Sequence, residues 1–139
     1  MMDPVLTIVV GVTVLTVVGI ASGGAFLLRI LTGHQGANAL QKSFFRAGHA
    51  HAGVLVTLGI LLATLTAVVD ASPGWAAGGA IAVLVAAIFI PAGFFLSVLG
   101  TDPAKPGPMV ASIWLGAVCL VAGLVISGVT VISAGVSAL

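Results

Sequence analysis

The sequence alternates between long apolar stretches and short polar ones. Apolar residues fill four segments, at about 5–31, 47–69, 75–99 and 109–138. A helix needs roughly 20 apolar residues to cross the hydrocarbon of a bilayer, and each of these segments is long enough. The pattern therefore predicts an all-α fold, a four-helix transmembrane bundle that forms a single domain over residues 1–139.

Turn-forming and polar residues mark where these segments begin and end. Asp3 and Pro4 precede the first segment and are typical of a helix start. The longest polar connection covers residues 32–46, a turn covers 70–74, and a proline-rich connection covers 101–108. These three connections leave no room for a second, soluble domain.

Composition supports a membrane protein. Apolar residues make up 60% of the chain, charged residues only 5%, and the mean hydropathy is +1.36. A soluble domain carries about 25% charged residues, so lipid must cover most of this surface. The net charge of +1, without a dense basic cluster, argues against a nucleic-acid partner. The expected partner is the lipid bilayer.

The distribution of basic residues predicts the orientation. Arg29, Lys42, Arg46 and Lys105 all lie at or in the first and third connections, which must share one side of the membrane. Basic residues gather on the cytoplasmic side of membrane proteins. We therefore predict a multi-pass protein of the cell membrane, with both termini outside and the first and third connections in the cytoplasm.

Small residues recur at helical spacing and predict close helix packing. In the fourth segment they are Ser112, Gly116, Cys119, Gly123, Ser127, Thr130 and Ala134. Gly19 and Gly23 in the first segment, and Gly59, Ala63 and Ala67 in the second, suggest similar seams. Small residues let helix backbones approach closely in lipid. Because four such thin helices enclose little interior, we also expect a homo-oligomer or a subunit of a larger membrane complex.

One group of residues could carry chemistry. Arg46, His49 and His51 stand together where the first connection enters the second segment. Ionisable side chains at such a position suggest a functional site. The alternative is that they lie in the headgroup layer, with Arg46 reaching lipid phosphate.

Helix geometry limits what this site can be. Residues two apart on a helix point about 200° away from each other, so His49 and His51 cannot hold one metal from a regular helix. Arg46, His49 and Gly53 share one face, and His34 could add a ligand if the first connection folds back.

Glycines next to the histidines predict open space there. Gly48 and Gly53 could let a flat ring approach the imidazoles, and neutral imidazole binds haem iron, copper and zinc. The candidate ligand-binding residues are thus Arg46, His49, His51, Gly53 and His34, with His49, His51 or both as ligands of haem or a transition metal.

No catalytic residue can be assigned. The chain contains no glutamate, and of its three aspartates only Asp102 should lie on the same side as the histidines. Metalloprotease, nucleotide-loop and nucleophile-elbow motifs are absent from the sequence. Whether the protein is an enzyme is left open by the sequence.

Two family resemblances meet at residues 46–56, Arg-Ala-Gly-His-Ala-His-Ala-Gly-Val-Leu-Val. This stretch resembles the second-helix motif of the MAPEG family, which are homotrimeric four-span membrane proteins, several of them using glutathione. Gly53 and Val56 replace that motif's asparagine and glutamate, so only Arg46 carries over as an anion contact. The His-Ala-His pair also resembles short relatives of the haem–copper oxidase large subunit, which use such pairs near haem.

These observations lead to three functional hypotheses. The first is a membrane redox or ligand-binding protein that holds haem or a metal through His49 or His51. The second is a MAPEG-like enzyme, or an inactive relative, that binds an amphipathic or thiol-bearing ligand through Arg46 and the histidines. The third is an accessory subunit of a larger membrane complex.

Overall fold

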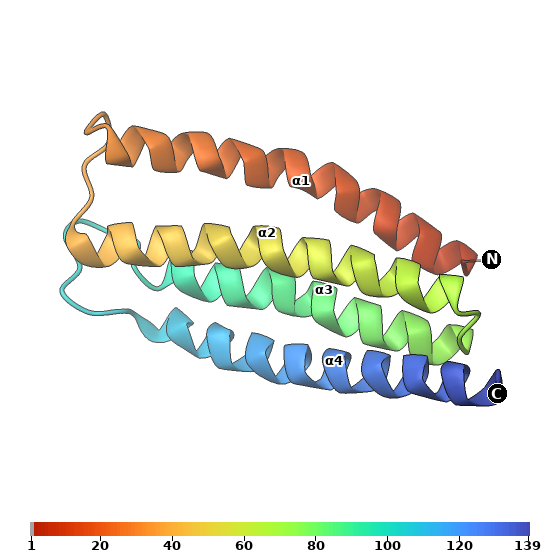
Figure 1. Cartoon of the computed structure of the whole chain (residues 1–139). Helices are drawn as coiled ribbons and strands as arrows, with labels where there is room; N and C mark the ends of the chain where they lie inside the picture. The colour runs from red at the N-terminus through yellow and green to blue at the C-terminus, as the bar shows by residue number, and fades with distance from the viewer. Residues whose placement is uncertain (1) are drawn as a thin grey trace.

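The computed structural model describes residues 2–139 as a bundle of long helices (Figure 1). In chain order these are α1 (Pro4–Leu31), α2 (Ala39–Val68), α3 (Pro73–Leu96), the short 3-10 helix η1 (Pro108–Val110) and α4 (Ala111–Ser137). The long helices alternate in direction, so both chain ends lie beside the α2–α3 turn. The α1–α2 and α3–α4 connections lie together at the opposite end, as the sequence predicts.

Each long helix is apolar enough to cross a membrane. The mean hydropathy of their most apolar 18-residue windows is between 2.0 and 2.5. Many large apolar side chains, such as Leu15, Val54 and Trp114, remain exposed on the outside of the bundle. Lipid is the environment in which such a surface is stable. The structure therefore supports a multi-pass membrane protein with four spans.

Local capping explains where the helices begin. The Asp3 carboxylate accepts hydrogen bonds from two backbone N–H groups in the first turn of α1, at 2.9 and 3.2 Å. Helix α2 begins at Ala39, well before the apolar segment predicted from residue 47. The cause is a capping box, in which Asn38 and Gln41 each accept a hydrogen bond from the other's backbone N–H. The polar start of α2 is therefore helical.

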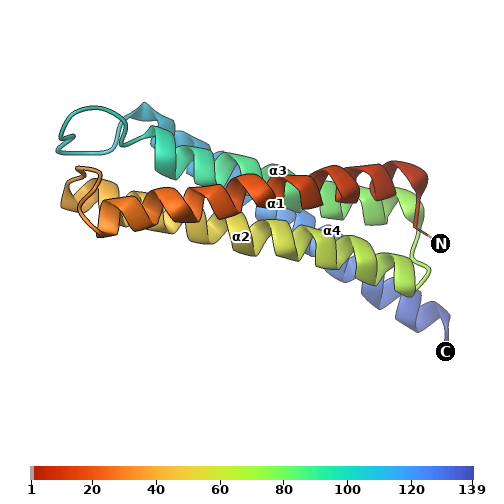
Figure 2. The same cartoon turned by 90° about the horizontal axis from the view of Figure 1, so that it is seen from above.

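Helix α3 is the centre of the bundle and α1 is its outermost member. Of the most apolar window of α3, 44% is buried, against 6% for α1. Helix α3 packs against both α2 and α4, whereas α1 packs mainly on α2. Near its start α1 also crosses α3, and Leu6 joins a buried cluster with Ala63 of α2 and Ala80 of α3 (Figure 2). Helices α2, α3 and α4 thus form a core, and α1 is attached to one side of it.

The small-residue stripe of α4 packs on α3, which confirms that prediction. Gly116, Gly123, Ser127 and Thr130 are buried, and the Ser112 hydroxyl donates to the Phe89 carbonyl of α3 at 2.7 Å. These contacts place the two helix backbones close together.

The other predicted seams are only partly correct. Gly59 of α2 is buried against Leu84 of α3, as expected for a packing residue. Gly23 of α1 faces α2, but nothing lies within 4 Å of a Cβ placed on Gly19. The expectation for Gly19 is therefore wrong, because α1 does not pack closely on its neighbours at that level.

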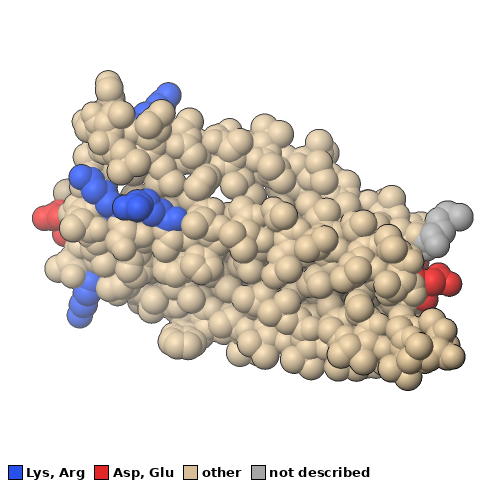
Figure 3. All heavy atoms as spheres, viewed as in Figure 1, with Lys and Arg blue, Asp and Glu red and all other residues tan. Residues whose placement is uncertain are grey.

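Charge is distributed unequally between the two ends. Figure 3 shows the Lys and Arg side chains at the end that carries the α1–α2 and α3–α4 connections. Arg29 lies in the last turn of α1, Lys42 and Arg46 lie early in α2, and Lys105 lies between α3 and α4. We call this the basic end. Asp3 and Asp70 lie at the opposite end, beside the α2–α3 turn.

Candidate functional site: the α1–α2 seam at the basic end

His49 lies in the seam between α1 and α2. Its side chain is half-buried and faces Gly23 and Gly24 of α1. A Cβ placed on Gly23 would lie 3.3 Å from His49 Nδ1, and one on Gly24 would lie 3.5 Å from Nε2. The two glycines thus leave the room that the imidazole occupies, and they offer no side chain that could pair with it.

His51 lies on a different side of α2. Its ring is exposed and stands 5.1 Å from the ring of Phe94 in α3, tilted by 32°. Its Nδ1 is 2.7 Å from the Ala47 carbonyl oxygen. A carbonyl only accepts, so this contact favours the tautomer with the proton on Nδ1 and leaves Nε2 as the free acceptor. The prediction that the two histidines use different faces is confirmed.

His34 does not join either of them. It is exposed in the α1–α2 connection, where its Nδ1 pairs with the Thr32 hydroxyl at 2.9 Å. Among residues 2–139 no three His, Cys, Asp or Glu side chains come together as a group that could hold a metal ion. The three histidines are therefore three separate positions in this fold.

Only one of the two predicted open spaces is present. Gly48 is buried, and a Cβ on it would lie 2.8 Å from the Phe95 ring, so aromatic side chains of α3 fill that space. The expectation of room beside Gly48 is wrong. Gly53 is different, because nothing lies within 4 Å of a Cβ placed there. Free space therefore exists on the face of α2 that carries His49.

Arg46 completes this face of the helix. It is exposed and precedes His49 by three residues, which corresponds to roughly 4.5 Å along the axis. Gly53 follows His49 by four residues, roughly 6 Å deeper. Cation, imidazole and open space thus follow one another from the basic end toward the middle of the bundle.

A second set of polar residues at this end was not assigned a role from the sequence. The Asn38 amide donates to the Asp102 carboxylate at 2.8 Å and to the Pro103 carbonyl at 2.9 Å. The Gln41 amide donates to the carbonyls of Val98 and Gly100, both at 3.0 Å.

These four bonds hold the start of α2 to the α3–α4 connection. Asp102 is thereby occupied by Asn38, a residue with no part in the histidine face. The only local signal in the sequence was the Asn-x-x-Gln spacing of the capping box, which gives no information about the distant partner.

The seam restricts how His49 could bind a metal or haem. The backbone of Gly24 faces Nε2 and that of Gly23 faces Nδ1, so an ion at either nitrogen would require α1 to move outward. His51 offers a free Nε2 on an exposed face, which amounts to one ligand for each chain. Within one chain these residues do not fit a haem or a multi-ligand metal centre.

Comparisons with known proteins found no match: no protein-family model, no curated protein and no solved structure is similar to the chain.

Proposed function

We propose that this chain is a membrane protein that binds an acidic amphipathic molecule in the α1–α2 seam at the basic end. The observation that carries this proposal is the half-buried imidazole of His49 between α1 and α2, in line with Arg46 and the open space at Gly53. An acidic head would pair with Arg46 and, once the little-buried α1 moves outward, accept a hydrogen bond from His49, while the apolar part would lie along Gly53.

Three features favour an amphipathic ligand over the haem and metal alternatives. The polar groups lie toward the basic end of the seam, where lipid headgroups are expected, and the open position beyond them, Gly53, carries no polar side chain. Arg46 supplies a charge suited to a carboxylate or phosphate. Finally, an acidic molecule needs no second protein ligand, whereas His49 and His51 lie on different sides of α2 and cannot share one metal centre. This is also the role that the MAPEG resemblance implies for Arg46.

Binding of oleate, as a single-chain acidic probe, tests the proposal. Replacing Arg46 by alanine in the detergent-solubilised chain should weaken oleate binding roughly tenfold, the cost of one charge-assisted hydrogen bond. Gly53→Leu should also weaken it by filling the open space, and it should do so without a clash because nothing lies near that position. Fluorescence or calorimetric titration would give the affinities.

The matched controls for this experiment lie elsewhere in the chain. Lys105→Ala removes an exposed charge at the same end, and Gly128→Leu fills another open glycine, on α4. Both should bind oleate as the unmodified protein does. If all four variants bind it equally, the seam is not the site. A Soret band in the spectrum of the purified protein would instead favour the haem hypothesis.

The proposed orientation places the basic end in the cytoplasm, because all four basic residues lie there. In a Cys119→Ala background, Ser72→Cys should react with a membrane-impermeant thiol reagent on intact cells. Lys42→Cys should react only after the membrane is permeabilised. Both positions are exposed, so access depends on the side of the membrane. Labelling of Lys42→Cys alone on intact cells would show the opposite orientation.

A further inference from the structure

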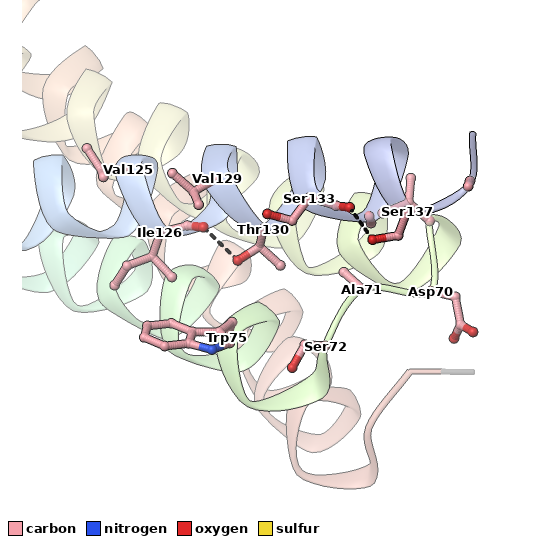
Figure 4. Close-up of a pocket in the computed structure, with 13 residues that line it drawn as sticks. Asp70, Ala71, Ser72, Trp75, Val125, Ile126, Val129, Thr130, Ser133 and Ser137 are labelled. Atoms are coloured by element: carbon pink, nitrogen blue, oxygen red, sulfur yellow. Dashed lines mark hydrogen bonds between the residues drawn. The ribbon is translucent and has the colours of Figure 1, made fainter.

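A cavity opens at the end of the bundle away from the basic residues. Its volume is about 580 Å³, within the range of small-molecule sites. The second half of α4 forms one wall, and the α2–α3 turn with the first turn of α3 forms the other (Figure 4). Trp75 is the one large side chain of the second wall.

The lining changes from apolar to polar along the cavity. Val125, Ile126 and Val129 line the part nearer the middle of α4, and Ser133 and Ser137 line the part nearer the chain end (Figure 4). From Val125 to Ser137 the helix rises roughly 18 Å. One half of the hydrocarbon of a bilayer is roughly 15 Å thick. The cavity therefore matches the length and the polarity of one lipid leaflet.

The polar part can accept hydrogen bonds. The Ser137 hydroxyl donates to the Ser133 carbonyl at 2.9 Å, so its remaining lone pairs are free to accept. Ser72 precedes α3 without making a side-chain capping bond to the helix, and its hydroxyl is exposed at the cavity. A head group that donates hydrogen bonds would find partners on both walls.

The charge at this end is negative. Asp70 lines the cavity at the α2–α3 turn, with its exposed carboxylate directed away from Ser137 (Figure 4), whereas every Lys and Arg lies at the basic end. The backbone fixes the position of Asp70. Its φ is 51°, and the N–H of the next residue, Ala71, donates to the Thr66 carbonyl at 2.9 Å. This arrangement ends α2 in a Schellman motif. An anionic head group would be repelled here, and an ammonium group attracted.

We propose that this cavity binds a membrane lipid with an ammonium head group, of the phosphatidylethanolamine type. Its acyl chain lies against Trp75 and the apolar part of α4, and its ammonium group lies at the α2–α3 turn, on the side of Ser72 and Asp70 (Figure 4). A lipid is favoured over the helix of a second copy because the cavity is amphipathic along its length. This site is independent of the α1–α2 seam, which lies at the other end of the bundle.

Trp75 provides a local reporter for the test. The chain has two tryptophans, and Trp114 is exposed on α4, so Trp114→Phe leaves Trp75 as the only one. The solubilised chain is titrated with phosphatidylethanolamine or phosphatidylglycerol that carries brominated acyl chains, which quench tryptophan. Phosphatidylethanolamine should quench Trp75 at a concentration roughly two- to fivefold lower than phosphatidylglycerol does, as expected for one partly exposed charge pair.

Variants distinguish quenching by lipid bound in the cavity from quenching by lipid in the surrounding detergent. Ala134→Phe, or the smaller Ser133→Leu if the first does not fold, should abolish the difference between the two lipids by filling the cavity. Val136→Phe, on the exposed side of α4, should retain it. Asp70→Asn keeps a residue type that tolerates positive φ, and should lose the preference.

The proposal is overturned if the two lipids quench equally in the Trp114→Phe protein, or if Ala134→Phe and Ser133→Leu both leave the difference intact. Arg46→Ala should not affect this quenching. The outcome is therefore independent of whether the α1–α2 seam binds an acidic ligand.

Discussion

Gly123→Leu should separate α4 from α3 and lower the thermal stability of the solubilised protein by a large margin. A Cβ on Gly123 would lie 2.8 Å from the Gly79 carbonyl oxygen and 2.9 Å from the Val83 nitrogen. Both are backbone atoms of α3, so no side-chain rotation can relieve the contact. We expect a cost of roughly 3 kcal/mol or more, at the upper end for overpacked cores, measured as the shift of the unfolding midpoint in detergent.

The same substitution five residues further along α4 is the matched control. Gly128 is exposed, and nothing lies within 4 Å of a Cβ placed there. Gly128→Leu should therefore leave the midpoint nearly unchanged, although it makes the same chemical change in the same helix. Equal midpoints for the two variants would mean that the α3–α4 packing described above is incorrect.

Gln41→Leu should release the start of α2 from the α3–α4 connection. Gln41 is 8% exposed, and its amide satisfies the carbonyls of Val98 and Gly100. Leucine has a similar size but cannot donate, so both carbonyls would lose this partner, and the Asn38 N–H would lose the side-chain acceptor that forms half of the capping box. A cost of roughly 2–4 kcal/mol follows from the usual penalty for unsatisfied buried groups. The unfolding midpoint again reports it.

Gln35→Leu is the control for this second prediction. Gln35 is exposed in the α1–α2 connection, and its structural contact is made by the backbone, which donates to the Arg29 carbonyl at 3.1 Å. That hydrogen bond survives the substitution, so stability should hardly change. If Gln35→Leu and Gln41→Leu lower the midpoint by the same amount, the apolar replacement itself, and not the lost hydrogen bonds, is responsible.

For the histidine motif, the sequence predicts the helix face of each residue but not the neighbouring helix that the residue contacts. The angular spacing of a helix is enough to place His49 and His51 on different faces, and the structure agrees. Which neighbour each one meets depends on helices that are distant in the chain. His49 faces Gly23 and Gly24 of α1, and His51 stands beside Phe94 of α3. The sequence offered Gly48 and Gly53 as sources of space; Gly53 is open, but phenylalanines of α3 fill the space at Gly48.

Three features could be predicted from the amino-acid sequence alone: the four apolar helices, the gathering of the basic residues at one end and the small-residue face of α4. These features depend on composition and helical period, which are local properties of the chain. Other features needed the three-dimensional packing: α1 lies mainly on α2, Asn38 pairs with Asp102 across 64 residues of sequence, and a cavity opens beside Trp75. Each of these three features depends on how separate helices pack against one another. In a chain this uniformly apolar, the hydrophobic pattern does not distinguish one helix partner from another.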